Sequence, residues 1–182
     1  LTLWMMNNYK PKYVVGNTYH KLAQTENAAN AFGPWNPAEF TVEDSAFGFI
    51  VMENGATIYL ESSWALNSLD VGEAQTTLHG TQGGADMKDG LRINGEADGM
   101  MYDKTMVLEP GGVDFYDGSG DDPAYLEAKQ WIESIQNDTE PVVSPEQALV
   151  VTQILEAIYQ SAKTGAPVYI NQHKEELGKI LV

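Results

Sequence analysis

Two largely apolar runs between Val42 and Trp64, separated by Asn54-Gly55, predict a hairpin of two strands around that dipeptide, with apolar residues on both faces. Asn-Gly in a two-residue turn favours type I′, which fixes how the strands pair. Counting outward from that turn, one face carries Phe47, Phe49, Val51, Ile58 and Leu60. The other face carries Ile50, Met52 and Tyr59. We expect the larger face to pack on helices and the smaller one to contact another sheet or another subunit.

Two later segments have the 3.6-residue spacing of helices and residues typical of helix ends. One begins at Asp122-Pro123 and runs to about Asn137, with a predicted buried stripe of Ala124, Tyr125, Ala128, Trp131, Ile132 and Ile135. The other runs from the capping box of Ser144 and Gln147 to Gly165. Its predicted stripe is Ala148, Leu149, Thr152, Leu155, Ile158, Tyr159 and Ala162.

Shorter elements account for the rest of the chain. Residues 1–6 read as the end of a helix whose beginning is missing, with Asn7-Asn8 as its C-cap. A strand is expected over 13–22, followed by a long ordered loop, or a short helix plus a loop, over 23–41. Short antiparallel strands are expected at 73–79, 85–88, 91–94 and 105–109. A last strand, 168–170, precedes a charged tail that we expect to form a short helix. These elements predict a single α+β domain over residues 1–182: a large, mostly antiparallel sheet with helices on one face and the other face available for oligomerisation.

Composition limits the classes of function. A chain of 182 residues with 43% apolar residues can bury one ordinary core. The net charge of −16, from 26 acidic and 10 basic residues, repels nucleic-acid phosphates and anionic lipids, so neither is an expected partner. The sequence has no apolar run of membrane-spanning length, no signal-peptide pattern and no cysteine, from which we expect a cytoplasmic protein.

Few residues suggest chemistry on their own. His20, His79 and His173 have no second ligand at metal spacing, so we expect no metal site. Glu43 and Asp44 are adjacent on a strand and point to opposite faces, so they cannot work as a paired acid and base. A hydrogen-bonding anchor for the preceding loop is the favoured role for the pair.

Glycine-rich and acidic loops give no cofactor or ion site either. The segment 80–84 (Gly-Thr-Gln-Gly-Gly) is expected to be a turn between strands rather than a dinucleotide fingerprint, because no helix follows it. The segment 117–122 resembles the start of a calcium loop but lacks glycine at the sixth position and glutamate at the twelfth.

A series of motifs covers nearly the whole chain: Glu43-Asp-Ser-Ala-Phe-Gly-Phe, Asn54-Gly-Ala-Thr, Glu61-Ser-Ser-Trp64, Leu78-His-Gly-Thr-Gln-Gly-Gly84, Pro141-Val-Val-Ser-Pro-Glu-Gln-Ala148, Glu156-Ala-Ile-Tyr-Gln-Ser-Ala162 and Gly165. In this order they resemble the C-terminal, dihydrodipicolinate reductase-like domain of Gfo/Idh/MocA oxidoreductases. The resemblance implies an NAD(P)-dependent dehydrogenase with an N-terminal Rossmann domain and a C-terminal domain that binds substrate and builds homodimers or tetramers. It also implies a substrate that is a sugar, an inositol or a related polyol.

The same resemblance implies that the catalytic residues are missing. The family's catalytic Asp and His precede a segment similar to residues 1–6, and its catalytic Lys lies in the Rossmann domain. We therefore expect this chain alone to bind neither NAD nor NADP and to be inactive. Residues here can still line the substrate side of a cleft, and the candidates are Trp35, Glu43, Asp44 and Trp64.

Other roles for these residues stay open at this point. Trp64 can equally be a core residue, and Trp35 can simply hold its own loop in place. The alternative function is a non-enzymatic sheet domain that binds a ligand or partner and dimerises through its open face. Under either hypothesis, the predicted subunit contact consists of Ile50, Met52 and Tyr59.

Overall fold

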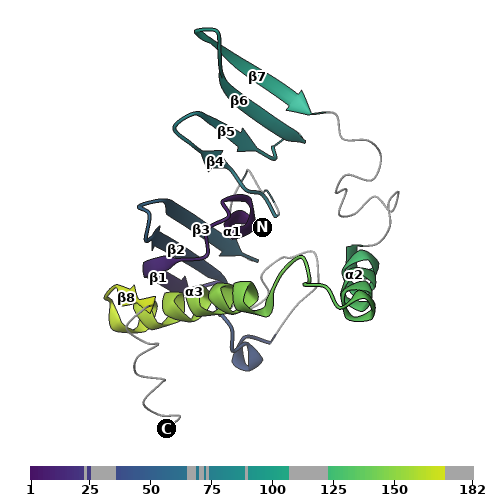
Figure 1. Cartoon of the computed structure of the whole chain (residues 1–182). Helices are drawn as coiled ribbons and strands as arrows, with labels where there is room; N and C mark the ends of the chain where they lie inside the picture. The colour runs from purple at the N-terminus through teal and green to yellow at the C-terminus, as the bar shows by residue number, and fades with distance from the viewer. Residues whose placement is uncertain are drawn as a thin grey trace. The chain divides into compact units, whose positions relative to one another are not determined.

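The computed structural model describes residues 1–22, 24–25, 36–64, 69, 72, 74–88, 90–106 and 123–170 (Figure 1). The chain divides into two compact units. We call Leu3–Leu69 with Pro145–Val182 the core unit, and Leu1–Thr2 with Asp70–Ser144 the meander unit. Antiparallel sheets with a few helices confirm the α+β class, and the strands of the described residues form two four-stranded sheets, one in each unit.

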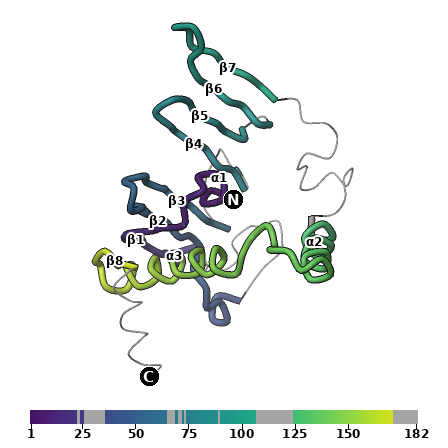
Figure 2. Tube along the Cα trace, in the orientation of Figure 1, coloured from purple at the N-terminus to yellow at the C-terminus, as the bar shows by residue number. Residues whose placement is uncertain are grey.

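The core unit is a sheet with a helix along one face. Its sheet has the order β3-β2-β1-β8 and is antiparallel throughout. Figures 1 and 2 show α3 running along this sheet. The elements are α1 (Thr2–Met5), β1 (Pro11–Tyr19), the 3-10 turn η1 (Pro37–Glu39), β2 (Ser45–Met52), β3 (Thr57–Ser63), α3 (Pro145–Thr164) and β8 (Val168–Tyr169).

The hairpin of β2 and β3 differs by one residue from the predicted register, because its loop has three residues. Ile50 lies opposite Ile58, not Tyr59. Gly55 has a left-handed φ of 87°, and its N–H donates to the Met52 carbonyl at 3.0 Å. A turn followed by a left-handed glycine is the usual three-residue hairpin loop, whereas a type I′ turn has two residues.

This shift reverses the predicted faces of β2, since a slip of one residue moves every side chain to the opposite face. Ile50 and Met52, which we assigned to a subunit contact, are buried in the core at 1% and 0% exposure. The three residues assigned to the core lie instead on the face turned away from α3: Phe47, Phe49 and Val51. The assignment of Ile50 and Met52 to the open face was therefore wrong.

The faces of β3 agree with the prediction. Ile58 and Leu60 pack against the core, and Tyr59 is 65% exposed on the open face. On β1, Val14 is fully buried, while its neighbour Val15 is 40% exposed. The strand begins and ends earlier than predicted, at Pro11 and Tyr19 rather than at 13 and 22.

A pair of glycines lets α3 approach the sheet closely. Gly16 of β1 lies opposite Gly48 of β2, and Ile158 of α3 packs over both. A Cβ added to either glycine would come within 2.7 Å of the Ile158 side chain. The hydroxyl of Ser161 accepts the Gly16 N–H at 3.0 Å, so the helix also bonds directly to the sheet backbone.

Helix α3 begins and ends where the sequence predicted, but the side of the helix that is buried differs from the predicted one. Gly165 ends the helix with a φ of 68°. The predicted stripe was wrong at Leu149, Leu155 and Tyr159, which are 55%, 43% and 49% exposed. The buried residues are Ile154, Ala157, Ile158 and Ser161. Apolar residues occupy two sides of this helix, so periodicity alone could not decide which side meets the sheet.

The meander unit contains the predicted series of short antiparallel strands. Its sheet has the order β4-β5-β6-β7. A two-residue turn at Asp98-Gly99, with φ values of 53° and 75°, joins β6 and β7, so these strands are longer than predicted. The elements are β4 (Leu78–His79), β5 (Gly83–Asp86), β6 (Leu91–Ala97), β7 (Met100–Met106) and α2 (Pro123–Asn137).

Helix α2 begins at Pro123 and ends at Asn137, as predicted. Its predicted buried stripe is exposed in the described part of the chain: Trp131, Ile132 and Ile135 are 52%, 52% and 68% exposed. Asp122, the predicted N-cap, lies outside the described residues, as do the segment 117–122 and the tail after residue 170.

Candidate functional site

The candidate pair Glu43-Asp44 lies at the end of the core sheet, next to the paired ends of three strands. Tyr19 of β1 and Ser63 of β3 both pair with Ser45, the first residue of β2. The N–H of Asp44 donates to the Tyr19 carbonyl at 2.8 Å, and the Asp44 carbonyl accepts the Trp64 N–H at 3.2 Å. Backbone bonds of Asp44 therefore hold the strands on both sides of it.

The side chain of Asp44 is a buried anchor. It is 2% exposed, and its carboxylate accepts the backbone N–H groups of Lys21 and, at 2.7 Å, of Leu22. The Ser45 hydroxyl donates to it at 3.1 Å. These bonds fix the segment that leaves β1, which confirms the predicted anchoring role for Asp44. A carboxylate so enclosed offers little surface to a ligand.

Glu43 has a different environment. Its Oε1 accepts a hydrogen bond from the Tyr159 hydroxyl of α3 at 2.6 Å. This bond lowers the pKa of Glu43, and the nearby His20 lowers it further. The same bond raises the pKa of Tyr159. Glu43 is therefore ionised and Tyr159 is neutral near pH 7.

Trp64 is attached to the same residue. Its indole N–H donates to the Glu43 carbonyl at 2.8 Å, and its ring packs on Phe40 with centroids 4.7 Å apart. The side chain is 45% exposed, so Trp64 is not a core residue. Trp35 lies outside the described residues, and its assignment stays a prediction.

We call Glu43, Trp64, Phe40 and Tyr159 the Glu43 cluster. It combines an ionised carboxylate with a half-exposed indole, groups that accept hydroxyl hydrogen bonds and pack against ring carbons. A carboxylate with a lowered pKa is a weak base, so the geometry suits binding better than proton transfer. Sequence reasoning missed Tyr159, because its partner is 116 positions away along the chain and no local pattern marks such a contact.

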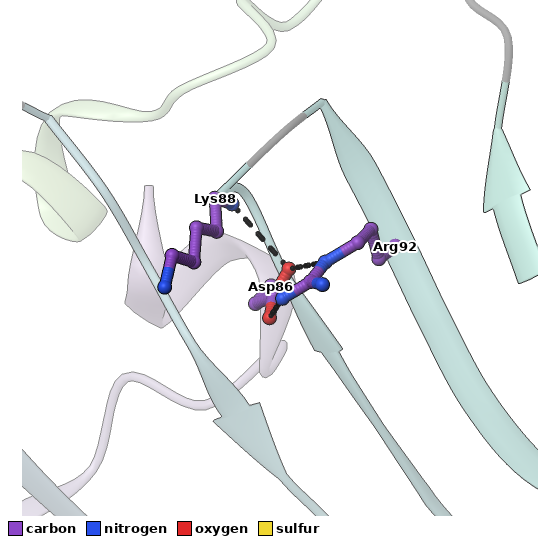
Figure 3. A network of polar contacts seen from close by, with 3 residues as sticks. All are labelled: Asp86, Lys88 and Arg92. Atoms are coloured by element: carbon purple, nitrogen blue, oxygen red, sulfur yellow. Dashed lines mark hydrogen bonds and ion pairs between the residues drawn. The ribbon is translucent and has the colours of Figure 1, made fainter. Parts of the chain in front are cut away.

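A second polar cluster lies on the sheet of the meander unit, and Figure 3 shows it. The Arg92 guanidinium donates from Nε to Asp86 Oδ1 at 2.8 Å and from Nη2 to Asp86 Oδ2. The backbone N–H of Lys88 also points at Asp86, and these contacts, Arg92 first, hold the pKa of Asp86 below its usual value. The ion pair lines an open hollow of about 1040 Å³, together with His79 and Asn94.

The Gly80–Gly84 segment of this unit contains the turn between β4 and β5 and the first two residues of β5, and the Gly80 N–H donates to the Gly83 carbonyl at 2.8 Å. The strands on its two sides are antiparallel, and no helix N-terminus follows it. These residues therefore do not fit a dinucleotide pyrophosphate, which such loops bind at the start of a helix. In the described ranges, no cluster of three or more His, Asp or Glu could hold a metal ion.

Comparison with known proteins gives consistent matches. Residues 4–170 match the family described as the oxidoreductase family, C-terminal alpha/beta domain. Over 161 residues the chain is 29% identical to D-glucoside 3-dehydrogenase of Escherichia coli (strain K12). The aligned residues cover 86% of this chain and 42% of that protein. The chain thus spans less than half of the length of this curated relative.

Solved structures share the fold. A levoglucosan dehydrogenase in complex with NADH and levoglucosan superposes with a TM-score of 0.64 at 18% identity, over 88% of this chain and 45% of that one. The aldose-aldose oxidoreductase from Caulobacter crescentus, complexed with glycerol, gives 0.61 at 17% identity, over 92% and 43%. Among the helices of the described residues, none has the length and apolar character needed to cross a membrane.

Proposed function

The chain belongs to the Gfo/Idh/MocA oxidoreductase family as its C-terminal α/β domain, and on that premise we propose that it binds substrate for an NAD(P)-dependent dehydrogenase of sugars, inositols or related polyols. The observation that carries the proposal is the family match over residues 4–170. The 29% identity to a glucoside dehydrogenase supports a sugar-like substrate. A cytoplasmic location is part of the same proposal.

The nucleotide belongs to another part of the protein in this proposal. The one glycine-rich turn of the described sheets, Gly80–Gly84, does not fit a dinucleotide. We therefore assign NAD or NADP to a Rossmann domain outside these 182 residues. NAD or NADP bound there would supply the hydride acceptor for the substrate, and the chain alone is inactive.

The chain's own contribution is to bind and orient the polyol. The ionised Glu43 carboxylate accepts a hydrogen bond from a substrate hydroxyl, and the half-exposed Trp64 indole packs against the ring carbons. Trp35 remains a further candidate for such a contact. Asp44 acts indirectly, because its buried carboxylate fixes the backbone beside Glu43.

The open face of the core sheet is the proposed contact between subunits of a homodimer or tetramer. Its exposed apolar side chains are Val15, Tyr19, Phe49 and Tyr59, at 40%, 40%, 47% and 65% exposure. A Phe49→Asp, Tyr59→Asp variant should reduce the oligomer to monomers in light scattering, because charge is costly to bury in an apolar contact. Asn54→Asp at the hairpin tip is the control, and an unchanged mass in the double variant would exclude this face.

Turnover measurements on the full-length protein test the function. We expect reduction of NAD or NADP with at least one member of a panel of sugars, glycosides and inositols, and no turnover by the 182 residues alone. Activity in the isolated chain would contradict the assignment of catalysis to another domain. Polyol binding without turnover by the full-length protein would favour the non-enzymatic sheet domain that binds a ligand and dimerises.

A further inference from the structure

We propose that Tyr159 is a positioning residue of the substrate side, whose hydroxyl orients the Glu43 carboxylate toward a hydroxyl of a polyol ligand next to Trp64. This inference rests on the proposed function and adds a residue to its binding site. Tyr159 is 49% exposed, and its hydroxyl donates a hydrogen bond to Glu43 Oε1 at 2.6 Å. A single exposed hydrogen bond contributes little to folding, so its main effect is on the orientation of its partner.

Glu43 is held at both ends. Its main-chain carbonyl accepts the Trp64 indole N–H at 2.8 Å, and its side chain accepts the Tyr159 hydroxyl. A carboxylate has about four lone-pair positions, so these contacts leave it able to accept a further bond. The carboxylate and the indole are therefore fixed relative to each other through one residue.

Helix α3 supplies a rigid support for the Tyr159 hydroxyl. The preceding residue, Ile158, is 2% exposed and packs on Gly16 and Gly48. Two residues later, Ser161 accepts the Gly16 N–H at 3.0 Å. The phenol thus projects from the best-packed part of the helix, which limits how far Glu43 can move.

The chemical class of ligand follows from the two groups. An anionic acceptor recognises a hydroxyl donor and repels anions, and an indole face suits the C–H groups of a sugar ring. A site that bonds a substrate hydroxyl discriminates against the analogue that lacks it, because that hydrogen bond is then not made. We therefore expect a neutral polyol and a loss of binding for its deoxy analogue at one position.

The pH dependence gives a readout that a purely structural role would not change. The groups that act on Glu43 are Tyr159 from α3, His20 from the end of β1 and the adjacent Asp44. Tyr159 lowers the pKa of Glu43 most, so its removal raises that pKa. Binding needs the ionised carboxylate and is lost as pH falls through this pKa. The acidic limb of binding should therefore move to higher pH in Tyr159→Phe.

The test is steady-state kinetics of the full-length protein with its best polyol. Tyr159→Phe should raise KM about tenfold with little change in kcat, because a Glu43 carboxylate that is no longer held in place bonds the substrate hydroxyl less well. Glu43→Gln should raise KM similarly, and the double variant should be little worse than Glu43→Gln. Tyr125→Phe on α2, which is 57% exposed, is the matched control and should behave as the unaltered protein.

The outcomes separate this inference from the proposed function. An unchanged KM and an unchanged acidic limb in Tyr159→Phe, with unchanged Tm, would overturn the positioning role while leaving the dehydrogenase assignment standing. If the unaltered protein turns over no polyol, that assignment fails, and Trp fluorescence titration with methyl glucoside tests the site directly. Weaker binding of methyl glucoside by Tyr159→Phe than by the unaltered protein then supports the positioning role. Equal binding by the two proteins overturns it, and so does a lack of binding by the unaltered protein.

Discussion

The two units contain sheets with the same number of strands, but only one of them has a buried core in the described residues. Each sheet is four-stranded and antiparallel. The buried apolar side chains of the described chain all belong to the core unit: Leu3, Val14, Ile50, Met52, Ile154, Ala157, Ile158 and Ile170. The number of strands therefore does not decide where apolar surface is buried.

The difference lies in how a helix meets the sheet. In the core unit, α3 contacts β1 closely over the side-chain-free pair Gly16 and Gly48. In the meander unit, the apolar side of α2 is exposed within the described residues, with Ile135 at 68%. Close packing gives most of the stability of a small domain, so we expect the core unit to dominate unfolding. The Glu43 cluster lies at the end of this better-packed sheet.

The largest expected effect comes from removing the side chain that joins helix and sheet. Ile158→Ala should lower the free energy of unfolding by about 2–5 kcal/mol, because it leaves a cavity over the two glycines. Leu155→Ala is the control on the same helix, at 43% exposure, and should cost much less. Urea unfolding followed by circular dichroism measures both. Equal losses would show that α3 is not fixed through Ile158.

Sequence predicted the helix ends well because single residues determine them. Pro123, Pro145 and Gly165 act through backbone geometry that no distant contact changes. The starts of α2 and α3 and the end of α3 lie where these residues indicate. The family resemblance was confirmed by the match over residues 4–170. It rested on several motifs in order, which is more specific than any local pattern.

The register of the hairpin and the buried side of α3 could not be predicted in the same way. Both a two-residue and a three-residue loop fit Asn54-Gly55, and the choice depends on which face of β2 meets Ile158. That contact is made by residues about 100 positions away along the chain. The hydrogen bond from Tyr159 to Glu43 also joins residues that are far apart along the chain. The sequence therefore indicated Glu43 and Trp64 of the candidate site but not Tyr159.

The next effect concerns the buried anchor beside the site. Asp44→Ala should lower the free energy of unfolding by about 3 kcal/mol, because it leaves the backbone N–H groups of Lys21 and Leu22 without their charged acceptor. Glu43→Gln, which changes the neighbouring and more exposed carboxylate, should cost less than half of that. Thermal unfolding of both variants is the measurement. A larger loss for Glu43→Gln would reverse the roles given to the two residues.

A smaller effect sharpens the role of the glycine pair. Gly48→Ala should cost about 1–3 kcal/mol, because its Cβ would meet Ile158 Cδ1 at 2.7 Å. The same substitution in an Ile158→Ala background should cost clearly less, since the space is then available. A double-mutant cycle in urea gives the coupling. Additive losses would mean that Gly48 is needed for a reason other than the approach of α3.

The smallest effect is expected in the meander unit, at the ion pair of Asp86 and Arg92, whose side chains are 25% and 43% exposed. The lowered pKa of Asp86 means that its stabilising effect is present above the unfolded value of 3.8 and is lost as pH falls through the folded value. Because the pair is partly exposed to solvent, Asp86→Asn should lower the Tm at pH 7 only slightly, and this small loss should disappear as pH falls through the folded pKa of Asp86. The amide exchange of β5 and β6 should increase. Asp103→Asn on the same sheet is the control for lost charge. A decrease in Tm as large as that of Gly48→Ala would show that the meander unit stabilises the chain as much as the core unit does, and the contrast between the two sheets would then fail.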